Sequence, residues 1–90
     1  MIYLNVRHTV ADYSKWRVAF DADETARRAA GATGVQQVYR DLDNPGAITV
    51  IIEWDDAEKA LKFGQDPRFA EVTKKAGVIG APEVRFLSRA

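Results

Sequence analysis

The segment ITVIIEWDDAE, residues 48–58, changes its periodicity at Trp54. Up to Trp54, apolar side chains recur at every second position, which is the spacing of a β-strand. Beyond it, Asp55 and Glu58 have the three-residue spacing of a helix capping box, with Asp where Ser or Thr is usual. The pattern predicts that a strand ends and a helix begins within one or two residues, with a large aromatic side chain at the junction.

The same change occurs near the start of the chain, where it places the single histidine. Residues 2–8 alternate between apolar and polar side chains, and His8 shares the parity of the apolar ones. Asp12 follows as an N-cap, and Trp16 and Phe20 then recur at helical spacing. A second strand-to-helix unit is therefore predicted here, with His8 at the end of the strand.

Glycine, proline and aspartate positions divide the rest of the chain. We expect a helix over residues 13–30, strands over 34–40, 47–54 and 83–88, and a helix over 56–64 that restarts at Pro67. The order βαββαβ in one domain, residues 1–90, is that of a ferredoxin-like α+β fold. Right-handed crossovers then place the helices on one face of a four-stranded antiparallel sheet, with strand order 4-1-3-2.

The other face of such a sheet has no helices to cover it. The 90 residues are 47% hydrophobic and include two Trp, three Tyr and four Phe. A domain of this size buries only about 60–65% of the surface of its unfolded chain. A homodimer joined through the open sheet face is the expected remedy.

Charge and cysteine content exclude several classes of function. Lys and Arg together number 13, as do Asp and Glu, so no basic excess points to nucleic acid or an anionic membrane as partner. The chain has no cysteine, which excludes disulfides, thiolate catalysis and thiolate metal sites. It contains no membrane-spanning apolar run, no signal peptide and no metal-binding motif, so we expect a cytoplasmic protein without a metal.

Three motifs resemble the dimeric α+β barrel superfamily, and within it the small proteins related to antibiotic biosynthesis monooxygenases. They are D-x-x-x-W-x-x-x-F-D from Asp12, W-D-D-x-E-K-A from Trp54 and G-x-P-E-V-x-F-L from Gly80. The likeness covers nearly the whole chain. Members of the superfamily include cofactor-free quinone-forming oxygenases, polyketide cyclases, haem-degrading enzymes and proteins of no known activity.

The resemblance implies a sheet-to-sheet homodimer with a cleft between sheet and helices in each subunit. The haem-degrading members use an Asn, a Trp and a His together, and Asn5, Trp54 and His8 are the right residue types. Asn5 and His8, however, have opposite parity, so a regular strand does not direct both into one cleft. We therefore do not carry haem over to this chain and expect no cofactor.

Three residues are candidates for catalysis. The unperturbed pKa of a histidine, about 6.5, suits proton transfer at neutral pH, so His8 is a candidate base. The alternative is that His8 is a half-exposed residue at the end of a strand, without a catalytic role. Asp23 and Arg27 lie on the same side of the first helix as its aromatic residues, and their spacing of four residues allows them to pair. Such a pair could orient a polar substrate or stabilise an enolate or phenolate. The alternative for them is an exposed ion pair on a slightly rotated helix.

Four aromatic residues are candidates for the wall of a site that binds a planar ligand. They are Trp16, Phe20, Tyr39 and Trp54. Aromatic side chains at helical spacing also form plain hydrophobic core, and both interpretations hold where core and cleft share a wall.

The sequence favours a small-molecule-binding protein resembling cofactor-free monooxygenases or cyclases that act on phenolic or polyketide-like molecules. In this interpretation His8 is the base, and Asp23 and Arg27 orient the substrate. The alternative is a non-catalytic binding or stress-related homodimer whose cleft is filled by side chains. A cavity of about 300 Å³ or more between the first helix and the sheet, with His8 on its wall, would favour the enzyme.

Light scattering tests the expected homodimer. We expect a mass of two chains at micromolar concentration, because obligate interfaces typically bury on the order of 2,000 Å² or more and dissociate little at that concentration. A stable, folded species with the mass of one chain would contradict the prediction.

Overall fold

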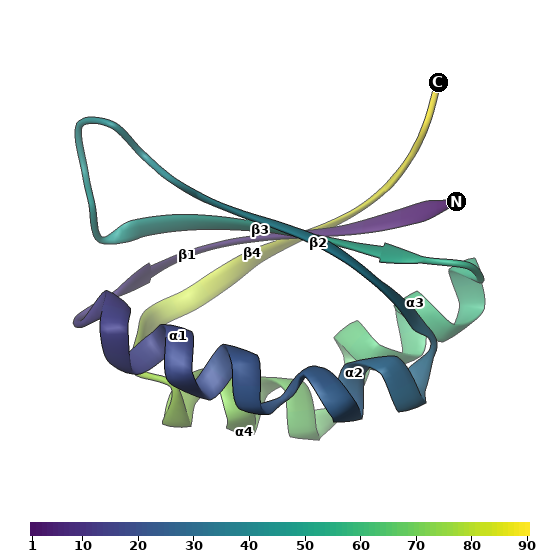
Figure 1. The fold of residues 1–90 in the computed structure, drawn as a ribbon, viewed down its shortest axis with the longest axis horizontal. Helices are drawn as coiled ribbons and strands as arrows, with labels where there is room; N and C mark the ends of the chain where they lie inside the picture. The colour runs from purple at the N-terminus through teal and green to yellow at the C-terminus, as the bar shows by residue number, and fades with distance from the viewer.

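The computed structural model describes residues 1–90, with the helices packed against one face of an antiparallel sheet (Figure 1). In chain order the elements are β1 (Ile2–Val10), α1 (Tyr13–Ala22), α2 (Glu24–Ala30), β2 (Ala32–Arg40), β3 (Ala47–Trp54), α3 (Ala57–Gln65), α4 (Pro67–Lys75) and β4 (Val78–Ser88). The strand order β2-β3-β1-β4 is the predicted one, so the ferredoxin-like α+β class is confirmed. No helix is both long enough and apolar enough to cross a lipid bilayer.

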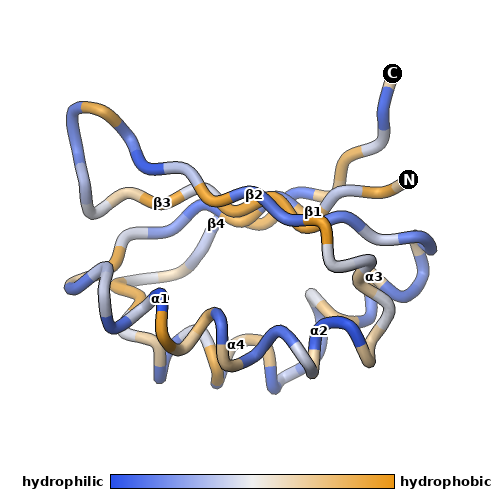
Figure 2. The backbone as a smooth tube through the Cα atoms, in the orientation of Figure 1, coloured by the Kyte–Doolittle hydropathy of each residue, from blue (hydrophilic) through white to orange (hydrophobic).

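The two central strands, β1 and β3, determine which side chains face the helices. They pair antiparallel, with Val6 opposite Val50 and His8 opposite Ile48. Because side chains alternate along a strand, His8 lies on the same face as the buried Val6 and Val50, as its parity predicted. Hydrophobic stretches accordingly lie in the central part of the sheet, which Figure 2 shows nearly edge on.

Trp54 lies at the end of β3 and is fully buried. Its indole packs on Phe63 of α3, with 5.1 Å between ring centroids. The junction between strand and helix is confirmed, but the capping residue is not the expected Asp55. Asp56 is the N-cap, because its carboxylate accepts the backbone N–H groups of Glu58 at 2.8 Å and Lys59 at 3.4 Å.

The first helix is interrupted at Asp23, where a single helix over residues 13–30 was expected. In an uninterrupted helix the Phe20 carbonyl would accept the N–H of Glu24. Here it accepts the Asp23 N–H at 3.2 Å and the Arg27 guanidinium at 2.8 Å. At the interruption, a side chain of α2 thus binds a carbonyl of the last turn of α1.

The first half of β4, which the sequence did not predict, contains a bulge opposite His8. Arg7 pairs with Glu83 whereas Thr9 pairs with Ile79, so residues 80–82 of β4 lie opposite a single residue of β1. Gly80 has a φ of +74°, a left-handed conformation that favours glycine. Bulges of this kind redirect side chains and are frequent beside functional sites.

The sheet face opposite the helices is mixed in character. On this face Arg7 donates two hydrogen bonds to the Asp41 carboxylate, at 2.9 and 2.8 Å. The same face carries Tyr39, which is 53% exposed, and Leu87, which is 41% exposed. No helix covers this face, as the sequence predicted (Figure 1).

Truncating Trp54 tests its place in the core. We expect Trp54→Ala to lower the free energy of unfolding by about 3–5 kcal/mol, the usual range for a buried large aromatic residue. Trp54→Phe is the matched control, because it keeps a six-membered ring against Phe63 and removes the smaller part of the indole, whose N–H has no hydrogen-bond partner. Urea unfolding at a fixed protein concentration measures both. A loss below about 1 kcal/mol for the alanine variant would contradict the packing described here.

Candidate functional site

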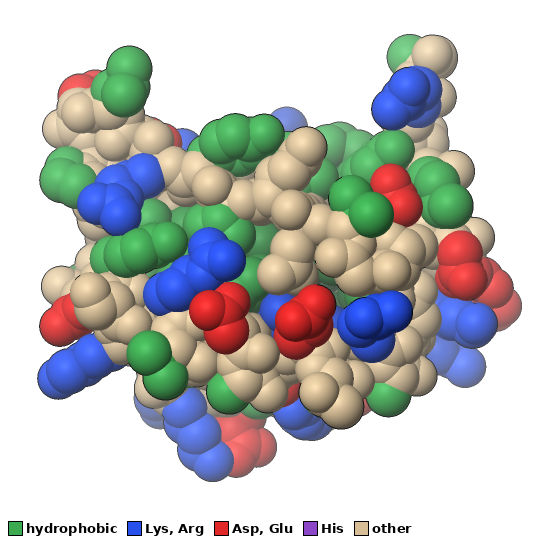
Figure 3. All heavy atoms as spheres, in the orientation of Figure 1, with side chains coloured by type: hydrophobic (Ala, Val, Ile, Leu, Met, Phe, Trp, Pro, Cys, Tyr) green, Lys and Arg blue, Asp and Glu red, His purple; other side chains and the backbone are tan.

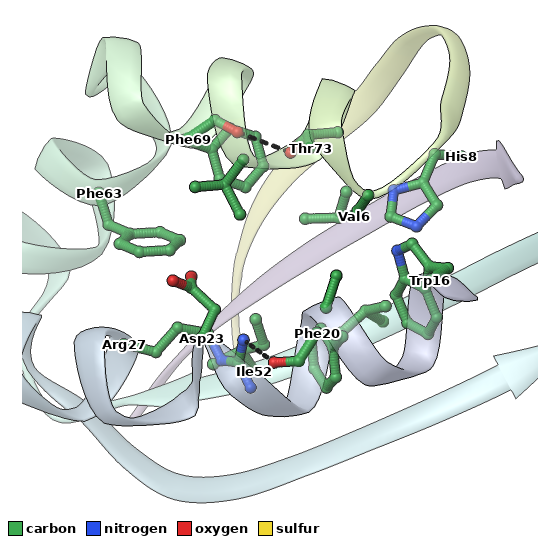
Figure 4. A pocket seen from close by; sticks show the side chains of 14 residues that line it. Val6, His8, Trp16, Phe20, Asp23, Arg27, Ile52, Phe63, Phe69 and Thr73 are labelled. Atoms are coloured by element: carbon green, nitrogen blue, oxygen red, sulfur yellow. Dashed lines mark hydrogen bonds between the residues drawn. The ribbon is translucent and has the colours of Figure 1, made fainter. Parts of the chain in front are cut away.

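A mainly apolar cavity lies between the sheet and the helices (Figure 4). β1 and β3 form its floor, and α1, α2, α3 and α4 contribute its walls. Ten of its fourteen lining residues are hydrophobic, and the other four are His8, Asp23, Arg27 and Thr73. The three residues that the sequence singled out for catalysis therefore line one cavity.

The cavity has a volume of about 60 Å³. One water molecule needs about 10–15 Å³ of such space, so the cavity has room for a few waters or for part of a compact ligand. His8 lies on the cavity wall, as expected for an enzyme, but the cavity is smaller than the volume of about 300 Å³ expected for an enzyme site. The interior is neither filled by side chains nor wide enough for a polycyclic molecule.

His8 presents an imidazole whose hydrogen-bonding capacity is unused. Both ring nitrogens are buried, and neither has a hydrogen-bond partner in the protein. The ring makes an edge-to-face contact with Trp16, with centroids 5.4 Å apart. Burial lowers the pKa of His8 below its ordinary value, because desolvation disfavours the charged form. The imidazole is therefore neutral at pH 7 and able to accept a proton.

An aromatic row leads along α1 from His8 toward Arg27. Trp16 stacks on Phe20 with centroids 4.9 Å apart and an interplanar angle of 17°. The Arg27 guanidinium lies over the other end of the row, 3.9 Å from the centroid of the Phe20 ring. His8 and Arg27 thus stand at opposite ends of the cavity, separated by two stacked rings (Figure 4). Both Trp16 and Phe20 line the cavity, as expected.

Arg27 is buried, with 3% of its surface exposed. Its guanidinium donates to the Phe20 carbonyl at 2.8 Å and to Gln36 Oε1 of β2 at 3.3 Å, while Nε has no partner. Burial lowers the pKa of Arg27, although an arginine remains charged at neutral pH. The site therefore contains a fixed positive charge at one end and a neutral base at the other.

Asp23 does not pair with Arg27, so that expectation was wrong. Its carboxylate forms an ion pair with Arg68 at the start of α4, 45 residues away in sequence. The i,i+4 geometry that would join Asp23 to Arg27 requires a continuous helix, and the helix is interrupted at Asp23. The Asp23 side chain is 13% exposed and that of Arg68 is 48% exposed, so the pair lies near the surface of the cavity wall.

Two of the four expected aromatic residues lie away from the cavity. Tyr39 pairs with Thr49 on the open face of the sheet, so its expected place in the ligand wall is corrected. Trp54 is part of the core behind Phe63 and does not line the cavity. Phe63 and Phe69 occupy the wall instead, and their rings meet edge to face with centroids 5.5 Å apart.

The residues of α4 that complete the site were visible in the sequence only as an apolar stripe. Phe69, Val72, Thr73 and Ala76 all line the cavity. The Thr73 hydroxyl donates to the Phe69 carbonyl at 2.7 Å, so it is already satisfied within the helix. The helical spacing of these residues indicated a buried side but gave no signal that it faces His8.

The outer surface over α1 and α2 carries acidic and basic side chains side by side (Figure 3). This agrees with the net charge of zero and gives no large field of one sign. No group of three His, Cys, Asp or Glu side chains is placed to hold a metal ion.

Comparisons with known proteins identify the fold through structure and not through sequence. No family model matches the chain, and no curated protein matches its sequence. A candidate antibiotic biosynthesis monooxygenase from Bordetella bronchiseptica superposes with a TM-score of 0.80 at 16% identity, over 99% of this chain and 96% of that one. A variant of SnoaB, a cofactor-independent oxygenase from Streptomyces nogalater, superposes with a TM-score of 0.75 at 15% identity, over 98% and 91% of the two chains.

A Mycobacterium tuberculosis protein, Rv0793, has the same fold, with a TM-score of 0.70 at 16% identity over 99% of this chain and 94% of that one. The chain therefore has the α+β fold of the antibiotic biosynthesis monooxygenases, and it spans nearly the whole length of these structures. Identities of 15–16% establish a shared fold alone.

The lowered pKa of His8 makes a prediction about stability and pH. Between the folded and unfolded pKa values the unfolded chain binds more protons, so the free energy of unfolding falls as pH drops below about 6.5. His8→Gln removes this contribution and leaves every carboxylate in place. We expect the free energy of unfolding, measured in urea, to fall more for the wild type than for His8→Gln when the pH is lowered from 7 to 5. A difference that is the same at both pH values would contradict the burial of the imidazole.

Proposed function

We propose that this protein binds a compact phenolic molecule in the cavity and oxidises it with O₂ to a quinone, without a cofactor. The observation that carries the proposal is the His8 imidazole, whose two buried nitrogens have no partner in the protein. Buried polar groups are usually satisfied, so an imidazole that lines a cavity and has no protein partner supports a ligand as the partner, provided that the ligand uncovers the two ring nitrogens, which solvent does not reach in this structure. The shared fold with a cofactor-independent oxygenase supports the same reaction class.

His8 is the base in this proposal. Its neutral imidazole accepts the phenol proton, and the electron-rich phenolate carbon then forms a bond to O₂. The O–O bond breaks, one oxygen atom becomes the second quinone carbonyl, and the other leaves with the two hydrogens of the phenol O–H and C–H as water. Phenol and O₂ therefore give quinone and water, with all atoms and electrons accounted for.

The other lining residues hold the ring. Trp16 and Phe20 line the cavity with aromatic side chains, and Arg27 provides a charge-assisted donor at the far end. The carboxylate of Asp23 connects α1 to Arg68 of α4 and so fixes the wall on that side. An apolar lining also limits water, which strengthens each polar contact with the ligand.

The volume of about 60 Å³ is too small for a polycyclic polyketide and holds only part of a single ring, so binding a single-ring substrate requires the cavity walls to move apart. The same observation favours a second candidate function, a non-catalytic dimer that binds small molecules. The two differ in one respect: His8 has a proton to move only in the oxygenase.

We also propose that the protein is a cytoplasmic homodimer joined through the open sheet face. The partly exposed apolar side chains of that face, Val35, Tyr39 and Leu87 among them, support an interface with a second copy. The polar side chains beside them would pair across the interface and fix how the two sheets align.

Replacing His8 tests the proposed reaction. We expect His8→Ala to lower kcat for a phenolic substrate by about 10²–10⁴-fold, the usual contribution of a general base, while ligand binding changes much less. Added imidazole should restore part of the turnover, because the substitution opens a space of the right shape. Oxygen uptake and quinone absorbance measure both effects.

Two results would contradict the oxygenase. If His8→Ala retains wild-type turnover, His8 is not the base, and Asp23 on the same wall becomes the next residue to replace. If the wild type consumes no member of a broad phenol and quinol panel, the binding protein is the better account.

A further inference from the structure

Arg27 carries a buried positive charge that no carboxylate contacts. All of its hydrogen bonds go to neutral acceptors, the Phe20 carbonyl and the side-chain oxygen of Gln36. It takes part in none of the four salt bridges of the molecule. A buried ion without an ionic partner is costly, and such ions are normally paired.

The carboxylate best placed to neutralise Arg27 is already in use. Asp23 lines the same cavity, but it is paired with Arg68. Asp23 therefore has a cationic partner in Arg68, whereas Arg27 has no anionic partner in a salt bridge. Asp23, Glu24 and Asp21 attract Arg27 at longer range and Arg17 repels it, but no carboxylate forms a salt bridge with it.

The position of the charge suits a ligand that lies in the cavity beside the aromatic row. The Arg27 guanidinium lies over the Phe20 ring and on the wall of the cavity, and its Nε donates to no protein atom. A planar guanidinium binds oxyanions more strongly than neutral oxygens, because both partners of the hydrogen bonds are charged. The apolar lining strengthens this preference by keeping the local dielectric constant low.

We propose that the cavity selects aromatic molecules that carry an oxyanion, a ring carboxylate or a phenolate, and that Arg27 is the residue that selects them. This inference rests on the proposed binding of a single-ring ligand and adds its charge. His8 remains at the opposite end of the aromatic row, free to accept a proton from a second ring substituent (Figure 4).

Benzoate and benzamide form a matched pair of probes, because they have nearly the same shape and differ in charge. Isothermal titration calorimetry at pH 7 should give a benzoate affinity at least about 10-fold higher than that of benzamide for the wild type. Arg27→Met should bring the two affinities together, whereas Arg27→Lys should keep most of the preference. Circular dichroism and thermal unfolding establish that each variant is folded.

A second variant keeps the test decisive if Arg27→Met does not fold. Asp23→Asn removes a negative charge from the cavity wall and frees Arg68, so it should raise the affinity for benzoate and leave that for benzamide nearly unchanged.

The outcomes separate this inference from the proposal on which it rests. Equal affinity of the wild type for both probes would overturn the anion preference and leave ring binding intact. A preference that Arg27→Met leaves unchanged would also overturn it. Failure of both probes to bind would overturn ring binding itself, and the anion preference with it.

Discussion

The antiparallel register between β1 and β3 decides which side chains can meet in the candidate site. Val6 opposite Val50 and His8 opposite Ile48 set one face of the sheet toward the helices. A slip of one residue would turn His8 to the open face, because the side-chain period of a strand is two. The buried apolar side chains of this register contribute about 1.5–3 kcal/mol each, and that energy holds His8 against Trp16.

The fold was predictable because local signals agree with the tertiary arrangement. Alternation predicted most of each strand, Asp12 and Asp66 marked the starts of two helices, and the short connection between β2 and β3 predicted the hairpin. Two departures were not predictable, because each depends on a distant contact. The break at Asp23 accompanies the binding of the Arg27 guanidinium to the Phe20 carbonyl, and the bulge opposite His8 depends on how β4 pairs with β1.

In the candidate site too, local patterns were predictable from the sequence and distant contacts were not. Strand parity and helical spacing brought His8, Trp16 and Phe20 together correctly. Tyr39 was misplaced because its residue type suggested a ligand wall, while its parity already assigned it to the other face from Val38. The ion pair of Asp23 with Arg68 crosses 45 residues, and no spacing rule within a helix reports such a partner. Alternation and spacing thus predict which face a side chain occupies but not which distant group it meets.

The proposed chemistry depends most directly on a neutral His8 whose buried ring nitrogens have no protein partner, and nuclear magnetic resonance can observe it without ambiguity because His8 is the only histidine. Ring nitrogen shifts recorded across a pH titration, with and without a single-ring phenol, give its charge and its hydrogen bonding. We predict a pKa below the ordinary value of about 6.5 and a change in the ring shifts when the phenol is added. A pKa at or above that value, with ring shifts that the phenol leaves unchanged, would contradict the account.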